Sequence, residues 1–462
     1  MKLTIIGGGG VRTPLFVRSV LRRADIFHFD EICLMDIDQP KLQVISGLCK
    51  EIVLSAGSDI QITETNVPIK AMDGAQYVVT TIRVGAEPGR VKDERIALKH
   101  NVLGQETTGP GGFAMALRNI PVILDYAELL NKLNPEAWLF NFTNPAGLVV
   151  QALHDRGYKR VIGICDGANL GQDSVAKFLC VPKKHIRAEI FGLNHLSWGR
   201  QMELNGKDVL PSLLMEEDFL TSSHLNIFER ELINNIGMWI NEYLYYYYYR
   251  EKALESILSE KSTRGEEILE LNRQLFEQME DIGIAHNPVK ALSTYYHYQQ
   301  RRNSTYMHYA RPNTPNKIEA DSIFDSLPFN SNFQDEGEGY AGVALDIIQA
   351  FETESQIITA LNVPNEGSIP CMDKDDVVEV SCRVSGKMIR PLPIGKIPEH
   401  QELLMRSVKS YEKLTVQAIL SGSRQKAVMA MMAHPLVMSY SLASILVDEY
   451  LSAHKEFIGN WK

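Results

Sequence analysis

Apolar runs alternate with helical periodicity along the first 200 residues of the chain. The runs lie at residues 3–6, 31–38, 77–82, 137–142 and 160–165. Such runs are typical of strands buried on both faces, and their alternation with helices indicates βαβ units around a parallel sheet. We therefore predict a Rossmann-like, doubly wound α/β domain over residues 1–200.

Longer helical patterns replace this alternation after residue 200. Residues 243–249 contain six tyrosines, for which an aromatic packing face is the simplest interpretation. Residues 304–333 form the most loop-like stretch. We predict one C-terminal, mainly helical α+β lobe over residues 201–462, folded over the N-terminal domain. Its expected helices lie at residues 256–280, 341–361, 400–420 and 423–457, with a strand pair at residues 377–384 and 387–392.

Composition narrows the classes of function. The 462 residues are 45% hydrophobic and 23% charged, which is typical of a globular chain with two or three cores. The net charge of −10 argues against nucleic acid or an anionic membrane surface as the main partner. No apolar run approaches membrane-spanning length and the first strand starts at Lys2, so we expect no signal peptide and a cytoplasmic location. The six scattered cysteines are expected to be reduced thiols.

Four consecutive glycines separate the first predicted strand from a helical stretch. This arrangement brings backbone N–H groups against the pyrophosphate of a dinucleotide. Asp36 closes the second predicted strand, where a carboxylate would bind the adenosine ribose and repel the 2′-phosphate of NADP. Arg12 or Thr13 replaces the third glycine of the strict fingerprint, and a tight turn without a ligand is the alternative interpretation. The predicted NAD-binding residues here are Gly7, Gly8, Gly9, Gly10 and Asp36.

Polar residues stand at the carboxyl ends of later strands, where parallel sheets bind their ligands. We expect Arg83 to bind the cofactor and the Asn144 amide to bind a substrate hydroxyl. Residues 83–112 are dense in arginine, acid and glycine. Glycines let the backbone approach a ligand and arginines offer forked donors, so this segment is predicted to be a substrate loop rather than a solvated surface loop.

Cys165 and His195 each follow a predicted strand and are candidate metal ligands. Structural metal sites usually show four clustered ligands, so from spacing alone a buried, hydrogen-bonded histidine is the simpler interpretation of His195. Two protein ligands would nevertheless leave positions open for substrate oxygens. The two residues by themselves leave both interpretations open.

The motifs, taken in order, resemble glycoside hydrolase family 4 over nearly the whole chain. The motif at residues 105–112 is highly specific. The matching motifs are the glycine cluster, Arg90-x-x-Asp93-Glu94, Gly104-Gln105-Glu106-Thr107-Thr108-Gly109-Pro110-Gly111-Gly112, Asn141-x-x-Asn144-Pro145-Ala146, Gly163-Ile164-Cys165-Asp166, Gly192-Leu193-Asn194-His195, Tyr243-Leu244-x-Tyr246-Tyr247, Thr263-Arg264-Gly265-Glu266, Leu361-Asn362-Val363-Pro364-Asn365 and Tyr411-Glu412-Lys413-Leu414-Thr415-Val416.

The resemblance implies a fold like that of lactate and malate dehydrogenases, assembled as a homodimer or homotetramer. It also implies a glycosidase that uses NAD without consuming it, unlike the glycosidases with paired carboxylates. Members of the family oxidise C3 of the sugar, remove the acidified C2 proton, eliminate the aglycone from C1, add water and return the hydride to C3. A divalent metal, usually Mn²⁺, bridges the C2 and C3 oxygens.

Matched motif by motif, the resemblance implies a role for each polar residue. Cys165 and His195 are implied to bind the metal. Tyr243 is implied to take the C2 proton, for which a neighbouring metal must lower its pKa. Glu106 is implied to raise the basicity of that tyrosine, and Asp166 to protonate the leaving oxygen. The implied substrate-binding residues are Arg90, Asn144 and Arg264.

The residues after the cysteine leave the anomer open. Cys165-Asp166-Gly167-Ala168 matches neither the Cys-Asn-Val-Pro form resembling 6-phospho-β-glucosidases nor the Cys-Asp-Met-Pro form resembling 6-phospho-α-glucosidases. The Gly-Gly-Val-Arg-Thr-Pro start is more similar to the β group, so a 6-phospho-β-glucosidase with a small phosphorylated sugar as substrate is favoured. The alternatives are a 6-phospho-α-glucosidase, a non-phosphorylated α-glycosidase, a lactate- or malate-type dehydrogenase and an NAD-binding regulatory protein.

Overall fold

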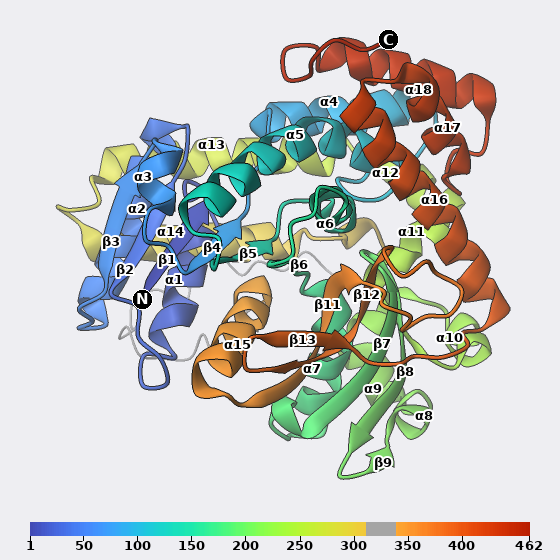
Figure 1. The fold of residues 1–462 in the computed structure, drawn as a ribbon, viewed down its shortest axis with the longest axis horizontal. Helices are drawn as coiled ribbons and strands as arrows, with labels where there is room; N and C mark the ends of the chain where they lie inside the picture. Colours follow the sequence, from blue (N-terminus) through green and yellow to red (C-terminus); the bar gives the residue numbers. More distant parts are fainter. Residues whose placement is uncertain (311–338) are drawn as a thin grey trace.

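A nine-stranded sheet forms the centre of the structure, a computed structural model that describes residues 1–310 and 339–462 (Figure 1). Six of its strands are parallel and stand in the order β3-β2-β1-β4-β5-β6. This is the order of a doubly wound sheet, so the predicted Rossmann-like α/β fold is confirmed. The parallel strands are β1 (Lys2–Ile6), β2 (Glu31–Met35), β3 (Gln61–Thr65), β4 (Tyr77–Thr80), β5 (Trp138–Asn141) and β6 (Val161–Gly163).

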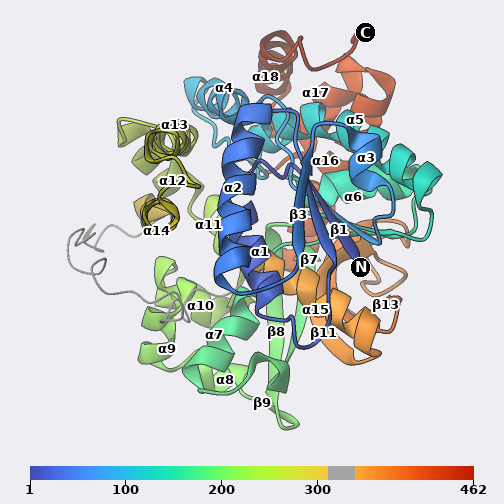
Figure 2. The same cartoon turned by 90° about the vertical axis from the view of Figure 1, so that its left-hand side faces the viewer.

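Helices cover both faces of this parallel region, which explains why its strands are continuous apolar runs. Figure 2 shows α1 and α2 on one face and α3, α5 and α6 on the other. Leu3, Ile5 and Val79 are each at most 1% exposed. Burial of each such side chain contributes about 1.5–3 kcal/mol relative to leaving it in water. The helices of this half are α1 (Thr13–Leu21), α2 (Gln39–Ser55), α3 (Pro68–Met72), α4 (Ala86–Lys99), α5 (Pro110–Leu133), α6 (Ala146–Asp155) and α7 (Leu170–Phe178).

Three antiparallel strands from the second half of the chain extend the sheet beyond β6. They are β11 (Gln356–Pro364), β12 (Val377–Ser385) and β13 (Met388–Pro391). The last two match the predicted strand pair. The predicted helix over residues 341–361 is wrong in its second half, because α15 (Gly339–Thr353) ends before β11 begins. All nine residues of β11 pair with β12, and this pairing outweighs the helical periodicity of the segment.

A smaller antiparallel sheet packs against β12 and contains a tight hairpin. Asn194 and His195 form the two-residue turn between β7 and β8. His195 has a φ of 62°, in the left-handed region that some β-turns adopt at their second central residue. The hairpin therefore holds the His195 backbone in a defined orientation. The strands of this sheet are β7 (Ile186–Leu193), β8 (Leu196–Leu204), β9 (Lys207–Asp208) and β10 (Trp239–Ile240).

The predicted helix over residues 256–280 is two helices, α12 (Arg250–Ser259) and α13 (Arg264–Ile282). A capping box at Thr263 explains the break. The Thr263 hydroxyl accepts a hydrogen bond from the Glu266 N–H at 3.3 Å, and the Glu266 carboxylate accepts one from the Thr263 N–H at 2.8 Å. These bonds satisfy N–H groups that a new helix leaves unpaired, so α13 starts here.

The helices near the C-terminus match the predictions closely. The predicted segment at residues 400–420 is α16, and the segment at residues 423–457 contains α17 and α18. Of the loop-like stretch at residues 304–333, residues 311–333 lie outside the described residues. Within residues 1–310 and 339–462, every helix is too short or too polar to cross a membrane. The helices not named above are α8 (Leu210–Leu213), α9 (Glu217–Ser222), α10 (Arg230–Ile236), α11 (Tyr245–Tyr248), α14 (Pro288–Ser304), α16 (Glu399–Ser421), α17 (Arg424–Ala433) and α18 (Tyr440–Ala453).

The two predicted lobes share one sheet. β11, β12 and β13 follow residue 200 in the chain, yet they pair onto the edge of the N-terminal parallel strands. The division into residues 1–200 and 201–462 therefore stays a prediction, and the shared sheet joins the two parts.

Candidate active site

A cavity of about 1350 Å³ lies at the carboxyl ends of the parallel strands, where the sequence predicted a ligand site. It extends from Asp36, after β2, to Tyr243 and the end of α14. Gly8 is the one predicted site residue that does not line it. The predicted residues that do are Gly7, Gly9, Gly10, Asp36, Arg83, Arg90, Glu106, Asn144, Cys165, Asp166, His195, Tyr243 and Arg264.

At one end of the cavity, the glycine turn is bound to Asp36. The Gly9 N–H donates to Asp36 Oδ2 at 3.0 Å, and a Cβ at Gly9 would lie 2.9 Å from the same oxygen. Gly7 has a φ of 91°, and a Cβ there would lie 2.8 Å from the Thr81 carbonyl. A Cβ at Gly8 would lie 2.8 Å from Leu34 Cβ, so this glycine permits packing against β2 instead. Side chains are thus excluded from the turn.

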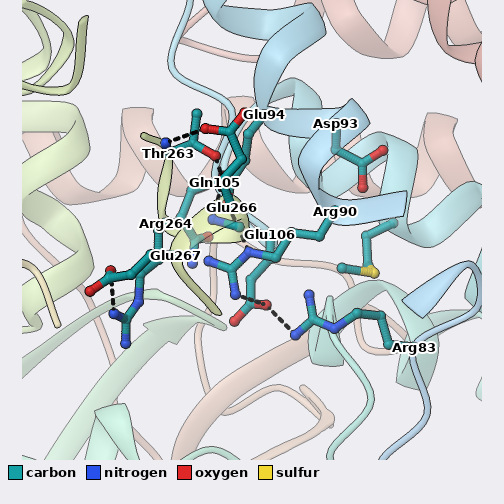
Figure 3. A network of polar contacts seen from close by, with 12 residues as sticks. Arg83, Arg90, Asp93, Glu94, Gln105, Glu106, Thr263, Arg264, Glu266 and Glu267 are labelled. Atoms are coloured by element: carbon teal, nitrogen blue, oxygen red, sulfur yellow. Dashed lines mark hydrogen bonds and ion pairs between the residues drawn. The ribbon is translucent and has the colours of Figure 1, made fainter. Parts of the chain in front are cut away.

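The Glu106 carboxylate contacts side chains that follow two strands of the sheet. Figure 3 shows its two arginine partners. Its Oε2 accepts hydrogen bonds from Arg83 at 2.7 Å and Arg90 at 3.2 Å. Its Oε1 lies 3.4 Å from the amide nitrogen of Asn144. Burial disfavours the Glu106 charge, but Arg90 and Arg83 outweigh that penalty and hold its pKa well below its ordinary value. One ionised carboxylate therefore aligns three cavity-lining side chains.

Arg264 and Arg302 form the wall where α13 meets the end of α14. Arg264 donates to Glu267 at 2.7 Å and to the Thr305 hydroxyl at 2.6 Å. It also donates to the Arg302 carbonyl at 2.7 Å, so it holds this end of α14 in place. Arg302 Nε and Nη1 are buried and have no hydrogen-bond partner among the described residues. Burial, reinforced by the charge of Arg12, lowers the Arg302 pKa to about 10.

The sequence analysis missed Arg302. It lies in an arginine pair at a helix end, a pattern that usually marks a solvated C-terminal turn. A buried guanidinium with unpaired N–H groups is costly unless an acceptor meets it, so this wall is suited to an anionic ligand.

Cys165, His195 and Tyr243 come together in the middle of the cavity. The His195 and Tyr243 rings stack with centroids 3.6 Å apart and planes within 9° of parallel. A Cβ at Gly167 would lie 3.6 Å from Cys165 Sγ and 3.5 Å from the Tyr243 ring. His195 Nδ1 is buried and has no hydrogen-bond partner in the part of the chain that the structure describes. A soft thiol and an unpaired imidazole nitrogen thus flank one phenol.

Burial governs the protonation of these three side chains. It lowers the pKa of His195 to about 3, so the imidazole is neutral at ordinary pH and its nitrogen can donate a lone pair. Burial raises the pKa of the Cys165 thiol, and the charges of Glu379 and Asp166 raise it further. Burial likewise raises the pKa of Tyr243 well above its ordinary value. A cation in this group would favour the thiolate and the phenolate.

Glu379 is a buried carboxylate behind this group that the sequence analysis also missed. It is 1% exposed and accepts hydrogen bonds from Asn194 at 3.2 Å, Ser197 at 2.9 Å and Asn362 at 3.0 Å. Burial raises its pKa to about 7. The sequence signal that could have identified it is a single acid within the apolar run of β12, because a buried charge needs partners. Glu379 connects the His195 hairpin to the large sheet.

The hydroxyl partner of Tyr243 is Tyr306, a residue that no sequence pattern singles out. Their hydroxyl oxygens lie 2.5 Å apart, and Tyr306 also donates to Glu242 Oε1 at 3.0 Å. The hydrogen bonds of Glu106 go instead to Arg83, Arg90 and Asn144. The predicted effect of Glu106 on Tyr243 therefore stays a prediction.

Comparison with known proteins yields relatives along the whole chain. A probable 6-phospho-beta-glucosidase of Bacillus subtilis is 31% identical over 99% of this chain and 97% of its own length. A 6-phospho-alpha-glucosidase of Leptotrichia buccalis is 29% identical over 98% of each chain. The solved 6-phospho-beta glucosidase of Thermotoga maritima, with manganese, NAD⁺ and glucose-6-phosphate, is 27% identical, covers 100% of both chains and has a TM-score of 0.81.

Two family models match consecutive parts of the chain. The model of the family 4 glycosyl hydrolases matches residues 2–181, and that of the family 4 glycosyl hydrolase C-terminal domain matches residues 190–437. Together the matches span both predicted lobes and every predicted site residue. This chain therefore belongs to the family 4 glycosyl hydrolases.

Proposed function

We propose that this protein is a 6-phospho-glucosidase that uses NAD and a divalent metal, with β-linked 6-phospho-glucosides as its favoured substrates. The observation that carries the substrate class is Arg302 at the cavity wall, whose buried Nε and Nη1 have no hydrogen-bond partner within residues 1–310 and 339–462. A phosphate group offers oxygens to both N–H groups and supplies negative charge beside Arg12 and Arg264. The relatives named for 6-phosphorylated substrates support the same class.

NAD fits the glycine end of the cavity. Gly7, Gly9 and Gly10 line it without side chains, which lets a pyrophosphate approach the backbone. Asp36 keeps free lone pairs for a ribose, and its charge disfavours a 2′-phosphate. When bound there, NAD supplies the hydride acceptor that oxidises C3 of the sugar and the donor that later reduces it. Arg83 is proposed to bind this cofactor, because its Nη1 is buried and no described residue offers it a hydrogen bond.

A divalent metal fits Cys165 and His195. The unpaired, neutral Nδ1 of His195 suits a metal, and two protein ligands leave positions for sugar oxygens. Manganese usually prefers harder ligands than a thiolate, but the solved Thermotoga maritima relative contains it. When bound, the metal supplies positive charge that stabilises oxygen anions and nearby thiolate and phenolate groups.

The side chains of this protein then divide the reaction among them. Oxidation at C3 makes the C2 proton acidic, and Tyr243 removes it. Asp166, next to Cys165 in the cavity lining, protonates the leaving oxygen as the C1 bond breaks. Arg90 and Asn144, both fixed by Glu106, hold the sugar hydroxyls in position. Water adds at C1, and Tyr243 returns a proton to C2.

An α-linked 6-phospho-glucoside is the second candidate substrate. Asp166 directly after Cys165 favours it, and one relative of similar identity is named for that anomer. Elimination through a C2 carbanion does not require a fixed orientation at C1, so one site can act on either linkage. The homodimer or homotetramer and the cytoplasmic location stay predictions.

A panel of nitrophenyl glucosides tests the proposal. The α and β anomers, each with and without a 6-phosphate, are assayed with NAD⁺ and Mn²⁺ while nitrophenol and NADH are followed separately. We expect nitrophenol release from the β-linked 6-phosphate, no net NADH, and loss of activity after chelation of the metal. Activity confined to unphosphorylated glucosides would overturn the substrate class, and net NADH formation would overturn the hydrolytic mechanism.

A further inference from the structure

Asn119 is a buried amide that joins two strand ends at the cavity. It lies in α5 and is 0% exposed. Its Oδ1 accepts a hydrogen bond from the Val84 N–H at 2.9 Å, and its Nδ2 donates one to the Asn144 carbonyl at 2.8 Å. Val84 follows β4 and Asn144 follows β5. One side chain therefore bridges the backbones of two segments that line the cavity.

This bridge continues the pairing of β4 with β5. Backbone pairing runs as far as the bond from the Phe142 N–H to the Thr80 carbonyl, at 2.9 Å. Beyond that bond, the Thr143 hydroxyl accepts the Ile82 N–H at 3.0 Å, and the two bonds of Asn119 follow. Buried backbone groups need such partners. Side chains thus replace the ladder where the two strands end.

Val84 is held through both of its polar backbone groups. Arg118, which precedes Asn119 in α5, donates from Nε to the Val84 carbonyl at 2.8 Å. Arg118 is itself 0% exposed and forms two hydrogen bonds to the Asp93 carboxylate, at 2.8 and 2.7 Å. Adjacent residues of one helix therefore fix the chain after β4, and Asn119 ties that chain to the end of β5 as well.

The two bridged segments carry residues with different proposed ligands. Arg83, next to Val84, is proposed to bind NAD, whereas the Asn144 side chain is proposed to hold a sugar hydroxyl. Oxidation of the sugar moves a hydride from C3 to NAD⁺, and the C3 hydroxyl proton goes to solvent. The hydride and a proton return at the end. Because a hydride moves only between closely placed atoms, the position of one segment relative to the other governs its rate.

We propose that Asn119 is a positioning residue that holds the NAD-binding segment and the sugar-binding segment in register for hydride transfer. This inference rests on the proposed function, in which NAD oxidises C3 of the sugar. Asn119 acts through the Val84 N–H and the Asn144 carbonyl. Without its amide, both backbone groups lose these hydrogen bonds and the two segments can shift relative to each other.

The first test uses the protein without NAD, metal or substrate. Asn119→Leu introduces a side chain of nearly the same size that offers no hydrogen bond. Amide hydrogen exchange, followed by mass spectrometry, should be faster in peptides that contain Val84, because its N–H loses the Asn119 acceptor. Unchanged exchange in these peptides would overturn the bridge.

Gln151→Met is the matched control. Gln151 is 2% exposed, and its amide also bridges two backbone groups, since it accepts from the Val377 N–H at 2.8 Å and donates to the Asp375 carbonyl at 3.1 Å. These three residues lie outside the cavity lining. The control variant should therefore leave exchange around Val84 unchanged.

The second test measures hydride transfer itself. Enzyme loaded with NAD⁺ and Mn²⁺ is mixed rapidly with methyl β-glucoside 6-phosphate, and NADH fluorescence is followed. At saturating NAD⁺ and substrate, Asn119→Leu should slow the appearance of NADH by about 10- to 100-fold, whereas Gln151→Met should keep the wild-type rate. Asn119→Asp keeps an acceptor for the Val84 N–H but lacks the donor to Asn144, so it should also be slower than the wild type.

Thermal unfolding establishes that each variant folds, and Asn119→Asp decides the matter if Asn119→Leu does not. A wild-type rate of NADH formation in the folded Asn119 variants would overturn the inference, even if their affinity for NAD falls. Equal losses in Gln151→Met would also overturn it, since the effect would then be a general loss of packing. Absence of both NADH formation and hydrolysis in the wild type would instead overturn the proposed function.

Discussion

The two ends of the cavity are built in different ways. At the end proposed to bind NAD, the cofactor end, Gly7, Gly9 and Asp36 lie within the first 36 residues and are held by the pairing of two adjacent strands. At the end proposed to bind the substrate, the sugar end, Cys165, Tyr243 and Arg302 come from separate segments that meet only after the hairpin and the helices have packed. The cofactor end is therefore a local structure, whereas the sugar end depends on tertiary packing.

This difference teaches where function is most sensitive to change. At the proposed cofactor end the turn presents backbone rather than side chains to the cavity, so single side chains there are expected to tune affinity. At the proposed sugar end each proposed reacting group is a side chain whose orientation depends on neighbours from other segments, as with His195 stacked on Tyr243. Substitutions there should affect chemistry or stability more strongly than substitutions at the turn.

The largest effect is expected for Tyr243→Phe. Removing the proposed base should lower kcat by about 1000-fold, while the affinity for NAD stays near that of the wild type. Steady-state kinetics and NAD titration measure the two quantities. Tyr245→Phe is the control, because Tyr245 belongs to the same segment, lies outside the cavity lining and packs against Phe228. Equal losses in both variants would mean that the effect is structural.

The next largest effect is expected for Arg302→Met. It removes the charge and the unpaired N–H groups while keeping a long apolar stem, so kcat/KM for the 6-phosphorylated substrate should fall by about 100-fold. Arg301→Met is its neighbour control, since Arg301 donates to Gln274 at 3.2 Å and does not line the cavity. Unchanged selectivity between phosphorylated and unphosphorylated glucosides in Arg302→Met would remove this residue from the phosphate site.

Glu379→Gln tests how strongly the sugar end depends on the buried carboxylate behind the His195 hairpin. Burial raises the Glu379 pKa from 4.5 to about 7, so the folded protein binds this proton more tightly than the unfolded chain. The stabilisation is complete below pH 4.5 and is lost as the pH rises to about 7. Its slope is at most about 1.4 kcal/mol per pH unit.

Chemical denaturation across this pH range checks the prediction. The wild-type free energy of unfolding should fall relative to that of Glu379→Gln as the pH rises, and the difference cancels contributions from other groups. A pH-independent difference would show that the pKa of Glu379 is the same in the folded and the unfolded protein.

The smallest effect is expected at the cofactor end. Asp36→Asn keeps acceptors for the Gly9 N–H and the ribose but removes the charge, so NAD affinity should fall by about 10-fold and discrimination against NADP should decrease. Titration with each dinucleotide measures both changes. If NADP binding does not improve relative to NAD, the charge of Asp36 does not determine cofactor choice, and the contrast between the two ends weakens.

Much of the fold could be predicted because it depends on local pattern. The apolar runs become the parallel strands, and the glycine turn and Asp36 directly follow the first two of them. Residues 356–364 could not be assigned in this way, since their strand forms only against β12 and β6. Arg302 and Tyr306 were missed for a related reason. Nothing around them in the chain reveals that α14 ends at the cavity.

By itself, the sequence determined the parallel sheet, the glycine turn and the identity of the motif residues, because apolar periodicity and local backbone chemistry suffice for these. Only the tertiary structure decided that Tyr306 meets Tyr243, that Glu379 supports the His195 hairpin and that Arg302 Nε and Nη1 at the cavity wall have no partner among the described residues. Hydrogen-bond partners and burial of this kind arise between segments far apart in the chain, and no local pattern encodes them.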